Sequence, residues 1–287
     1  MPALRFVVSM ALAVILLALT MPLAAQEKVP EKTQEKQVPK APEGFAIRRD
    51  GIERGQIETI EYDSKTLNTK RKLVVYTPPG YDKETQYPVF YLLHGKGGNE
   101  SDWTKWGSAG DILDNLYADK KLTPMIVVMP NGEIPNGDGS EFTVFESELF
   151  KDVMPLIEAR YATLTDPEHR ALAGLSRGGG QALRIGVRHL DTFAYIGGFS
   201  SANGRPRIPG DKGDAVKKIR LLWISCGEED SLLKANKGYH DLLEKQEIPH
   251  IWHVEAGGHT FTVWMNDLYL FSQKLFRDKE KEKAKDK

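Results

Sequence analysis

Short apolar segments alternate with longer amphipathic segments through most of this chain. The central apolar segments are continuous, which is typical of strands that are buried on both faces of a parallel sheet. The predicted strands are residues 56–62, 72–77, 89–93, 125–129, 171–175, 195–199, 221–226 and 251–254. The first two strands alternate more regularly and lie close together in sequence, which predicts an antiparallel pair at one edge of the sheet.

Four longer segments have the apolar spacing of helices: residues 145–160, 178–189, 231–246 and 262–276. Alternation of strands and helices predicts a three-layer α/β domain with right-handed crossovers. In such domains the functional residues follow the carboxyl ends of the strands. The residues after each strand are therefore the ones to inspect for chemistry.

The two ends of the chain differ from its middle. Residues 1–25 combine an early Arg5, an apolar stretch and a final Ala25, which predicts a signal peptide; an uncleaved membrane anchor is the alternative. Residues 26–44 are rich in Lys, Glu, Gln and Pro and predict a disordered linker. The folded domain should span residues 45–278 and a charged tail residues 279–287. We expect a secreted or periplasmic protein with no stable membrane insertion after cleavage.

Composition excludes several classes of function. The 287 residues carry a net charge of −1, so no basic surface for nucleic acid is indicated. The single cysteine, Cys226, cannot form an intrachain disulfide and is predicted to be buried. The chain has no His-x-x-x-His pair and no cysteine cluster, so the sequence indicates neither a metal site nor a cofactor.

The segment Gly174-Leu175-Ser176-Arg177-Gly178 places a G-x-S-x-G motif between a predicted strand and a predicted helix. Small residues two positions before and after the serine permit the tight turn that presents its hydroxyl at the top of the sheet. Ser176 is therefore the predicted nucleophile. A glycine-rich turn with a helix-capping serine is the alternative.

Partners for Ser176 follow two later strands. Asp230 comes after residues 221–226 and is the favoured acid, with Glu229 as the alternative; a helix cap would also explain an aspartate there. His259 comes after residues 251–254, behind two glycines, and is the predicted general base. The order Ser…Asp…His is that of α/β-hydrolases.

The loop after residues 89–93 is rich in glycine. The backbone N–H of Lys96 or Gly97 is predicted to form an oxyanion hole together with that of Arg177. Neighbouring His94 is expected to hold this loop by hydrogen bonds.

Trp103 and Asn131 also lie near the strand ends and are candidate substrate-binding residues. Packing of the indole and the chemistry of an Asn-Gly turn would explain them equally well.

Several segments in order resemble a known family. They are Pro88–Gly95, Gly174–Gly179, Cys226–Asp230 and Gly257–Phe261, and they are similar to segments of the feruloyl and acetyl-xylan esterases, a group related to enterochelin esterases, S-formylglutathione hydrolases (esterase D) and mycolyltransferases. The resemblance implies an α/β-hydrolase fold without a large lid, residues 132–145 being the only available cover. It also implies ester hydrolysis through an acyl-enzyme, with Ser176, Asp230 and His259 as the triad.

Three functions compete on this basis. The favoured one is a secreted carboxylesterase that acts on a small-molecule or carbohydrate ester, feruloyl and acetyl groups being typical. A siderophore-ester hydrolase or an acyltransferase would share every motif. A non-catalytic binding protein on the same scaffold is the third, because a fold does not determine a function.

Overall fold

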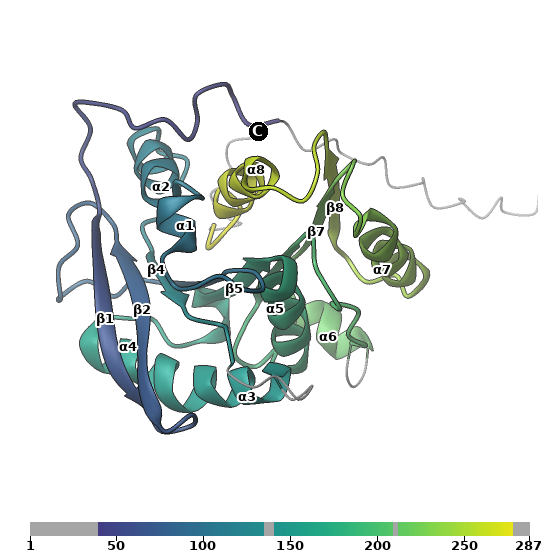
Figure 1. The fold of residues 1–287 in the computed structure, drawn as a ribbon, viewed down its shortest axis with the longest axis horizontal. Helices are drawn as coiled ribbons and strands as arrows, with labels where there is room; N and C mark the ends of the chain where they lie inside the picture. Colours follow the sequence, from purple (N-terminus) through teal and green to yellow (C-terminus); the bar gives the residue numbers. More distant parts are fainter. Residues whose placement is uncertain (1–39, 135–140, 209–211, 278–287) are drawn as a thin grey trace, which may run out of the picture. The chain divides into compact units, whose positions relative to one another are not determined.

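The computed structural model describes residues 40–134, 141–208 and 212–277. The predicted signal peptide, nearly all of the predicted linker, the charged tail and the middle of the predicted cover lie outside these residues. An eight-stranded sheet runs through the described part (Figure 1). Its strands are β1 (Gln56–Ser64), β2 (Thr69–Thr77), β3 (Val89–Leu93), β4 (Ile126–Pro130), β5 (Arg170–Leu175), β6 (Tyr195–Phe199), β7 (Leu221–Gly227) and β8 (Ile251–Glu255).

The strand order is β1-β2-β4-β3-β5-β6-β7-β8. Strands β1 and β2 form an antiparallel pair at one edge, and β2 also pairs antiparallel with β4. All other pairs are parallel. All eight predicted strands are confirmed, as is the antiparallel edge, and the boundaries differ from prediction by up to three residues.

Successive side chains of each central strand enter two separate cores. On β3, for example, Val89 and Tyr91 pack into one core, whereas Phe90 and Leu92 pack into the other. This is why the central strands are apolar at every position instead of every second one. Both cores need a cover of helices.

Helices supply that cover on both faces (Figure 1). Helices α2 and α8 pack on one face, and α3, α4, α5 and α7 on the other. The helices are α1 (Asp102–Lys105), α2 (Ala109–Ala118), α3 (Glu141–Glu148), the π-helix η1 (Leu149–Val153), α4 (Met154–Arg160), the 3-10 helix η2 (Pro167–His169), α5 (Ser176–Arg188), α6 (Lys212–Lys218), α7 (Leu233–Lys245) and α8 (Phe261–Ser272).

Two features of the helices differ from the prediction. The single helix predicted over residues 145–160 is interrupted by η1, directly before Pro155 in the first turn of α4. Proline lacks the N–H that would continue the regular ladder, so the helix widens by one residue at this point. Helices α1, α2 and α6 were not predicted.

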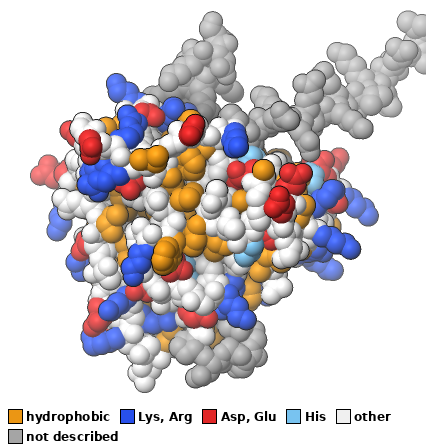
Figure 2. Space-filling view, turned by 45° about the horizontal axis from the view of Figure 1, so that its top comes forward, with side chains coloured by type: hydrophobic (Ala, Val, Ile, Leu, Met, Phe, Trp, Pro, Cys, Tyr) orange, Lys and Arg blue, Asp and Glu red, His pale blue; other side chains and the backbone are white. Residues whose placement is uncertain are grey.

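Hydrophobic side chains gather in the middle of the face shown in Figure 2, and acidic and basic side chains intermingle towards its edges. Cys226 is buried, as predicted, and burial raises the pKa of its thiol to about 12. Within the parts of the chain that the structure describes, none of the helices has the length and hydropathy of a membrane span.

Candidate active site

Ser176 is the first residue of α5 and directly follows β5. Its φ of 53° lies in the left-handed region, which non-glycine residues rarely adopt and which marks a sharp strand-to-helix turn. The close contacts of Gly174 and Gly178, which flank the serine, leave no space for a side chain at either position. A Cβ on Gly174 would come 2.7 Å from the Cβ of Leu93, and one on Gly178 would collide with the carbonyl oxygen of His94.

The structure brings the three predicted triad residues together. His259 Nε2 lies 2.9 Å from Ser176 Oγ, and His259 Nδ1 lies 2.7 Å from Asp230 Oδ2. In this arrangement the serine hydroxyl donates to Nε2, and Nδ1–H donates to the carboxylate. The three side chains therefore have the relative positions that a nucleophile, its base and an orienting acid require.

Of the two candidate acids, Asp230 and not Glu229 contacts His259. The Asp230 side chain is fully buried, and its Oδ1 accepts a hydrogen bond from Leu232 N–H at 2.8 Å. Burial raises the pKa of Asp230, but the hydrogen bonds from Leu232 and His259 outweigh it and leave the pKa lowered. Glu229 is exposed, and its N–H donates to the carbonyl of Gly257. Asp230 thus caps its own loop and also contacts His259.

Aromatic rings support the histidine from one side. The Trp264 ring lies edge-on to His259 with centroids 4.8 Å apart, and Phe261 packs against Trp264 at 5.2 Å. Gly257, with a φ of 124°, provides the turn into this loop. These contacts limit rotation of the imidazole and keep its Nε2 near the serine.

The glycine-rich loop after β3 lies against the nucleophile. A Cβ on Gly95 would come 3.3 Å from the Cβ of Ser176. The N–H of Gly97 donates to Glu133 Oε2 at 3.1 Å, so this donor is already engaged. The backbone N–H groups of Lys96 and Arg177 remain the candidate oxyanion donors. That of Arg177 lies in the first turn of α5, where an N–H has no partner within the helix.

Sequence reasoning missed Glu133, three residues after β4 ends. Its carboxylate binds the side chain of Arg177 as well as the N–H of Gly97. It therefore connects the loop after β3 to the first turn of α5. Glu133 directly follows the Asn131-Gly132 turn, and its position in a strand-end loop was the signal that could have identified it.

His94 has the structural role that the sequence predicted. Its Nε2 accepts a hydrogen bond from Gly132 N–H at 2.8 Å, and its Nδ1 lies 2.7 Å from the carbonyl of Gly95. Burial lowers the pKa of this imidazole. The neutral ring thus holds the loops after β3 and β4 together.

Asn131 uses both ends of its amide to shape the same loops. Its Nδ2 donates to Glu100 at 3.1 Å, and its Oδ1 accepts from Glu133 N–H at 2.9 Å. These bonds explain the residue by turn geometry, and a contact with substrate stays a prediction.

The candidate role of Trp103 in binding substrate needs correction. Its side chain is 0% exposed, and its indole N–H donates to the carbonyl of Leu93 at 3.0 Å. Its ring packs edge-on against Phe199 and Phe261. Trp103 therefore supports the loops from inside the domain instead of lining an open cleft.

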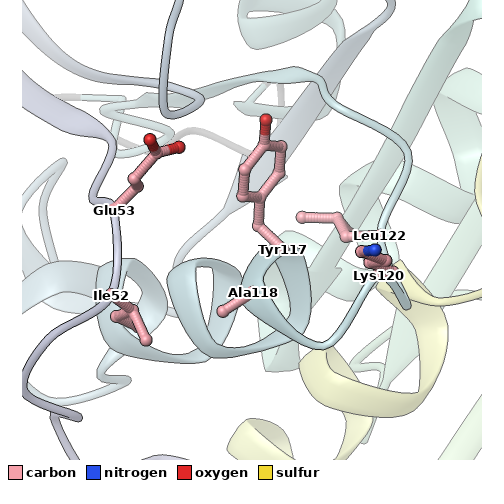
Figure 3. Close-up of a pocket in the computed structure, with 6 residues that line it drawn as sticks. All are labelled: Ile52, Glu53, Tyr117, Ala118, Lys120 and Leu122. Atoms are coloured by element: carbon pink, nitrogen blue, oxygen red, sulfur yellow. The ribbon is translucent and has the colours of Figure 1, made fainter.

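The structure also contains a pocket with a volume of 430 Å³ (Figure 3). Its walls come from the segment before β1 and from the end of α2 and the residues that follow: Ile52, Glu53, Tyr117, Ala118, Lys120 and Leu122. None of the predicted site residues lines it, so we do not assign the proposed chemistry to this pocket.

Comparison with known proteins places the chain among esterases. Residues 64–274 match the family model named Esterase. The chain is 32% identical to an endo-1,4-beta-xylanase/feruloyl esterase from Xylanibacter ruminicola over 251 residues, which are 84% of this chain and 34% of that protein. It is also 32% identical over 161 residues to endo-1,4-beta-xylanase Y from Acetivibrio thermocellus, covering 52% of this chain and 15% of that one. The chain thus spans about a third or less of these relatives.

Solved structures agree with the fold. A ferulic acid esterase from Anaeromyces mucronatus in complex with ferulic acid superimposes with a TM-score of 0.74 at 28% identity, covering 84% of this chain and 98% of that one. The S-formylglutathione hydrolase of Staphylococcus aureus has a TM-score of 0.61 at 19% identity, covering 77% and 99%. The predicted α/β-hydrolase fold is confirmed by these likenesses and by the strand order.

Proposed function

This chain belongs to the esterase family, a family of carboxylic-ester hydrolases, and from that membership we propose that it hydrolyses esters with Ser176, His259 and Asp230 as its catalytic triad. The observation that carries the proposal is the unbroken series of contacts from Ser176 Oγ through His259 to Asp230, at 2.9 and 2.7 Å. Apart from nucleophilic catalysis, few functions require a serine hydroxyl in contact with an imidazole that in turn contacts a buried carboxylate.

The reaction proceeds in two halves. His259 Nε2 removes the hydroxyl proton as Ser176 Oγ attacks the ester carbonyl, and Asp230 stabilises the imidazolium. The same proton passes to the leaving alcohol as the carbon–oxygen bond breaks, which leaves an acyl-serine. Water then attacks the acyl-serine with His259 as base, and the acid product and the free hydroxyl of Ser176 result.

The negative oxygen that forms in each half needs donors. We assign the backbone N–H of Arg177 and that of Lys96 to this role, because the first belongs to the free first turn of α5 and the second to the loop against Ser176. Each such donor stabilises the transition state by about 3 kcal/mol.

The substrate class that we propose is a feruloyl or acetyl ester of a carbohydrate. Support comes from the relatives, since one is named a feruloyl esterase at 32% identity and a structure at 28% identity holds ferulic acid. The half-buried ring of Phe261, which packs on Trp264 beside His259, is compatible with an aromatic acyl group.

The test compares purified wild type with Ser176→Ala on p-nitrophenyl acetate and methyl ferulate. We expect the variant to lose at least about 10³-fold in kcat on both esters. Ser231→Ala, an exposed serine beside the acid loop, is the matched control and should keep wild-type rates. Undiminished hydrolysis by Ser176→Ala would refute the assignment of the nucleophile.

The same assays separate the remaining functions. Transfer of the acyl group to an added alcohol in preference to water would identify an acyltransferase. Failure of a fluorophosphonate probe to label Ser176 would indicate a binding protein on this scaffold.

We also propose that the protein is exported, with residues 1–25 as the signal peptide. The apolar stretch that follows Arg5 and ends before Ala25 supports this proposal. The mass of the protein recovered from an expressing bacterial host should equal that of a chain starting at Gln26. Recovery of the intact chain from the membrane fraction would instead identify the segment as an anchor.

A further inference from the structure

A cluster of three polar side chains, two of them buried and one half-buried, lies between the last strand and the last helix. His253 and Glu255 lie on β8 two residues apart, so they share one face of the strand, and Asp267 lies in α8. Each side chain offers one ligand atom, and the three atoms lie within 4.8 Å of one another. None of the three belongs to the proposed triad, so the proposed reaction does not explain them.

Each of the three side chains has a buried atom without a hydrogen-bond partner among the described residues. These atoms are His253 Nε2, Glu255 Oε1 and Asp267 Oδ2. His253 is 8% exposed and Asp267 is 0% exposed. An unsatisfied polar atom in the interior is unfavourable, and native proteins contain few of them. A shared ion would satisfy all three atoms; the Ser225 hydroxyl also lies beside Asp267.

The second oxygen of each carboxylate is held in place by a neighbour. The indole N–H of Trp223 donates to Asp267 Oδ1 at 3.2 Å, and the side-chain amide of Asn266 donates to Glu255 Oε2. Metal-ligating carboxylates are typically oriented by such hydrogen bonds, which leave the other oxygen for the ion.

Charge points to the same kind of occupant. Two carboxylates held together away from water are unfavourable while both are charged, and either protons or a bound cation would relieve this cost. A divalent cation would balance both charges, with the imidazole of His253 as a neutral third ligand. A nitrogen ligand favours first-row transition metals over Mg²⁺ and Ca²⁺, which prefer oxygen.

We propose that His253, Glu255 and Asp267 form a binding site for a divalent first-row transition-metal ion such as Zn²⁺. Three protein ligands and one water would complete a tetrahedral zinc site. The sequence did not indicate the site, because the ligands come from a strand and a helix that only the fold brings together.

The ion would have a structural role beside the catalytic loops. It would join β8 to α8, and the segment between these elements carries His259. The carbonyl of Glu255 also accepts the N–H of Glu228, in the loop that leads to Asp230, at 2.7 Å. Binding is therefore expected to stabilise the base and the acid of the proposed triad together, without contact between the ion and the ester.

The experiment titrates ZnCl₂ into the full-length protein after EDTA treatment and dialysis, by isothermal titration calorimetry. We expect one Zn²⁺ to bind per chain and to raise the Tm. Asp267→Asn, which keeps an oxygen for Trp223, and His253→Gln should each weaken the affinity at least about 10-fold and lose the zinc-dependent rise in Tm. Circular dichroism and fluorophosphonate labelling of Ser176 show whether each variant is folded.

A second cluster in the chain provides the matched control. His240 and Glu244 on α7 and His250 after it also place ligand atoms within 4.8 Å of one another, but nearer the surface. His240→Asn should leave the zinc affinity and stoichiometry of the buried site unchanged. Loss of binding in His240→Asn but not in the two buried-site variants, or absence of zinc binding by the wild type, would overturn the proposal.

Discussion

Single side chains at this site satisfy more than one requirement at once. Asp230 caps its own loop by accepting Leu232 N–H and holds His259 through its other oxygen. Ser176 adopts a left-handed φ of 53°, which places its hydroxyl above the sheet and its successor's N–H in the first turn of a helix. The type of each residue and its backbone conformation together therefore position the groups that the proposed reaction uses.

Replacement of the acid separates its two roles. Asp230→Asn keeps an oxygen for Leu232, but its amide presents a donor to His259 Nδ1 and favours the wrong tautomer. We expect kcat on p-nitrophenyl acetate to fall about 10⁴-fold while the fold is retained. Glu229→Gln removes the exposed neighbouring charge and should change kcat by no more than about twofold, because solvent screens this charge. Wild-type turnover by Asp230→Asn would exclude it as the triad acid.

At the scale of elements, the sequence predicted strands better than helices. Each strand is a compact apolar segment, and strand residues gain their stability by burial on both faces. Helix α2 has apolar residues at helical spacing, at positions 109, 112, 113, 116 and 117, a signal that the prediction from sequence overlooked, and it packs against α8 and the sheet. Helix η1 arises where Pro155 interrupts a regular apolar pattern, so periodicity alone predicted one continuous helix.

The contact of α5 with the loop after β3 leads to a prediction on stability. Gly178→Ala would drive a Cβ into the carbonyl oxygen of His94, so we expect the free energy of unfolding in urea to fall by about 1–3 kcal/mol. Gly110→Ala in α2 is the control, because its Cβ would meet only the end of the exposed Ile57 side chain. That variant should be neutral or slightly stabilising. If the two variants were equally stable, the close approach of Gly178 to His94 would not restrict the size of the side chain at position 178.

At the scale of the whole molecule, buried polar contacts connect the loops at the carboxyl edge of the sheet. His94 joins the loops after β3 and β4, and Glu133 joins them to α5. The side chain of Arg71, paired with the buried Glu148, donates to the carbonyls of Asn131 and Glu133. These contacts couple the arrangement of the site loops to the buried side chains beneath them.

His94 contributes to the pH dependence of global stability, in the same direction as His250 and His253, whose pKa burial also lowers. Because burial lowers its pKa in the folded state, the unfolded chain binds more protons below the usual value of 6.5. We expect the free energy of unfolding to decrease as the pH falls from 6.5 towards 5, since a proton on Nε2 would remove the acceptor for Gly132 N–H. Urea titrations at several pH values measure this slope.

His94→Asn should lower stability at neutral pH but flatten the slope between pH 6.5 and 5. His169→Asn, at a partly exposed histidine, should keep the wild-type slope. If the free energy of unfolding of His94→Asn depended on pH as steeply as that of the wild type, other titratable groups would account for the pH dependence.

The sequence by itself determined the strands, the α/β class and the order of Ser176, Asp230 and His259, because burial patterns and turn motifs are local properties of a chain. Only the tertiary structure placed Asp230 and not Glu229 against His259, buried Trp103 in the interior and connected Glu133 to two site loops. Only the folded structure also brings His253 and Glu255 of β8 close to Asp267 of α8. Those outcomes depend on distances between segments that are remote in sequence, and such distances are set by packing of the whole domain and not by any local pattern.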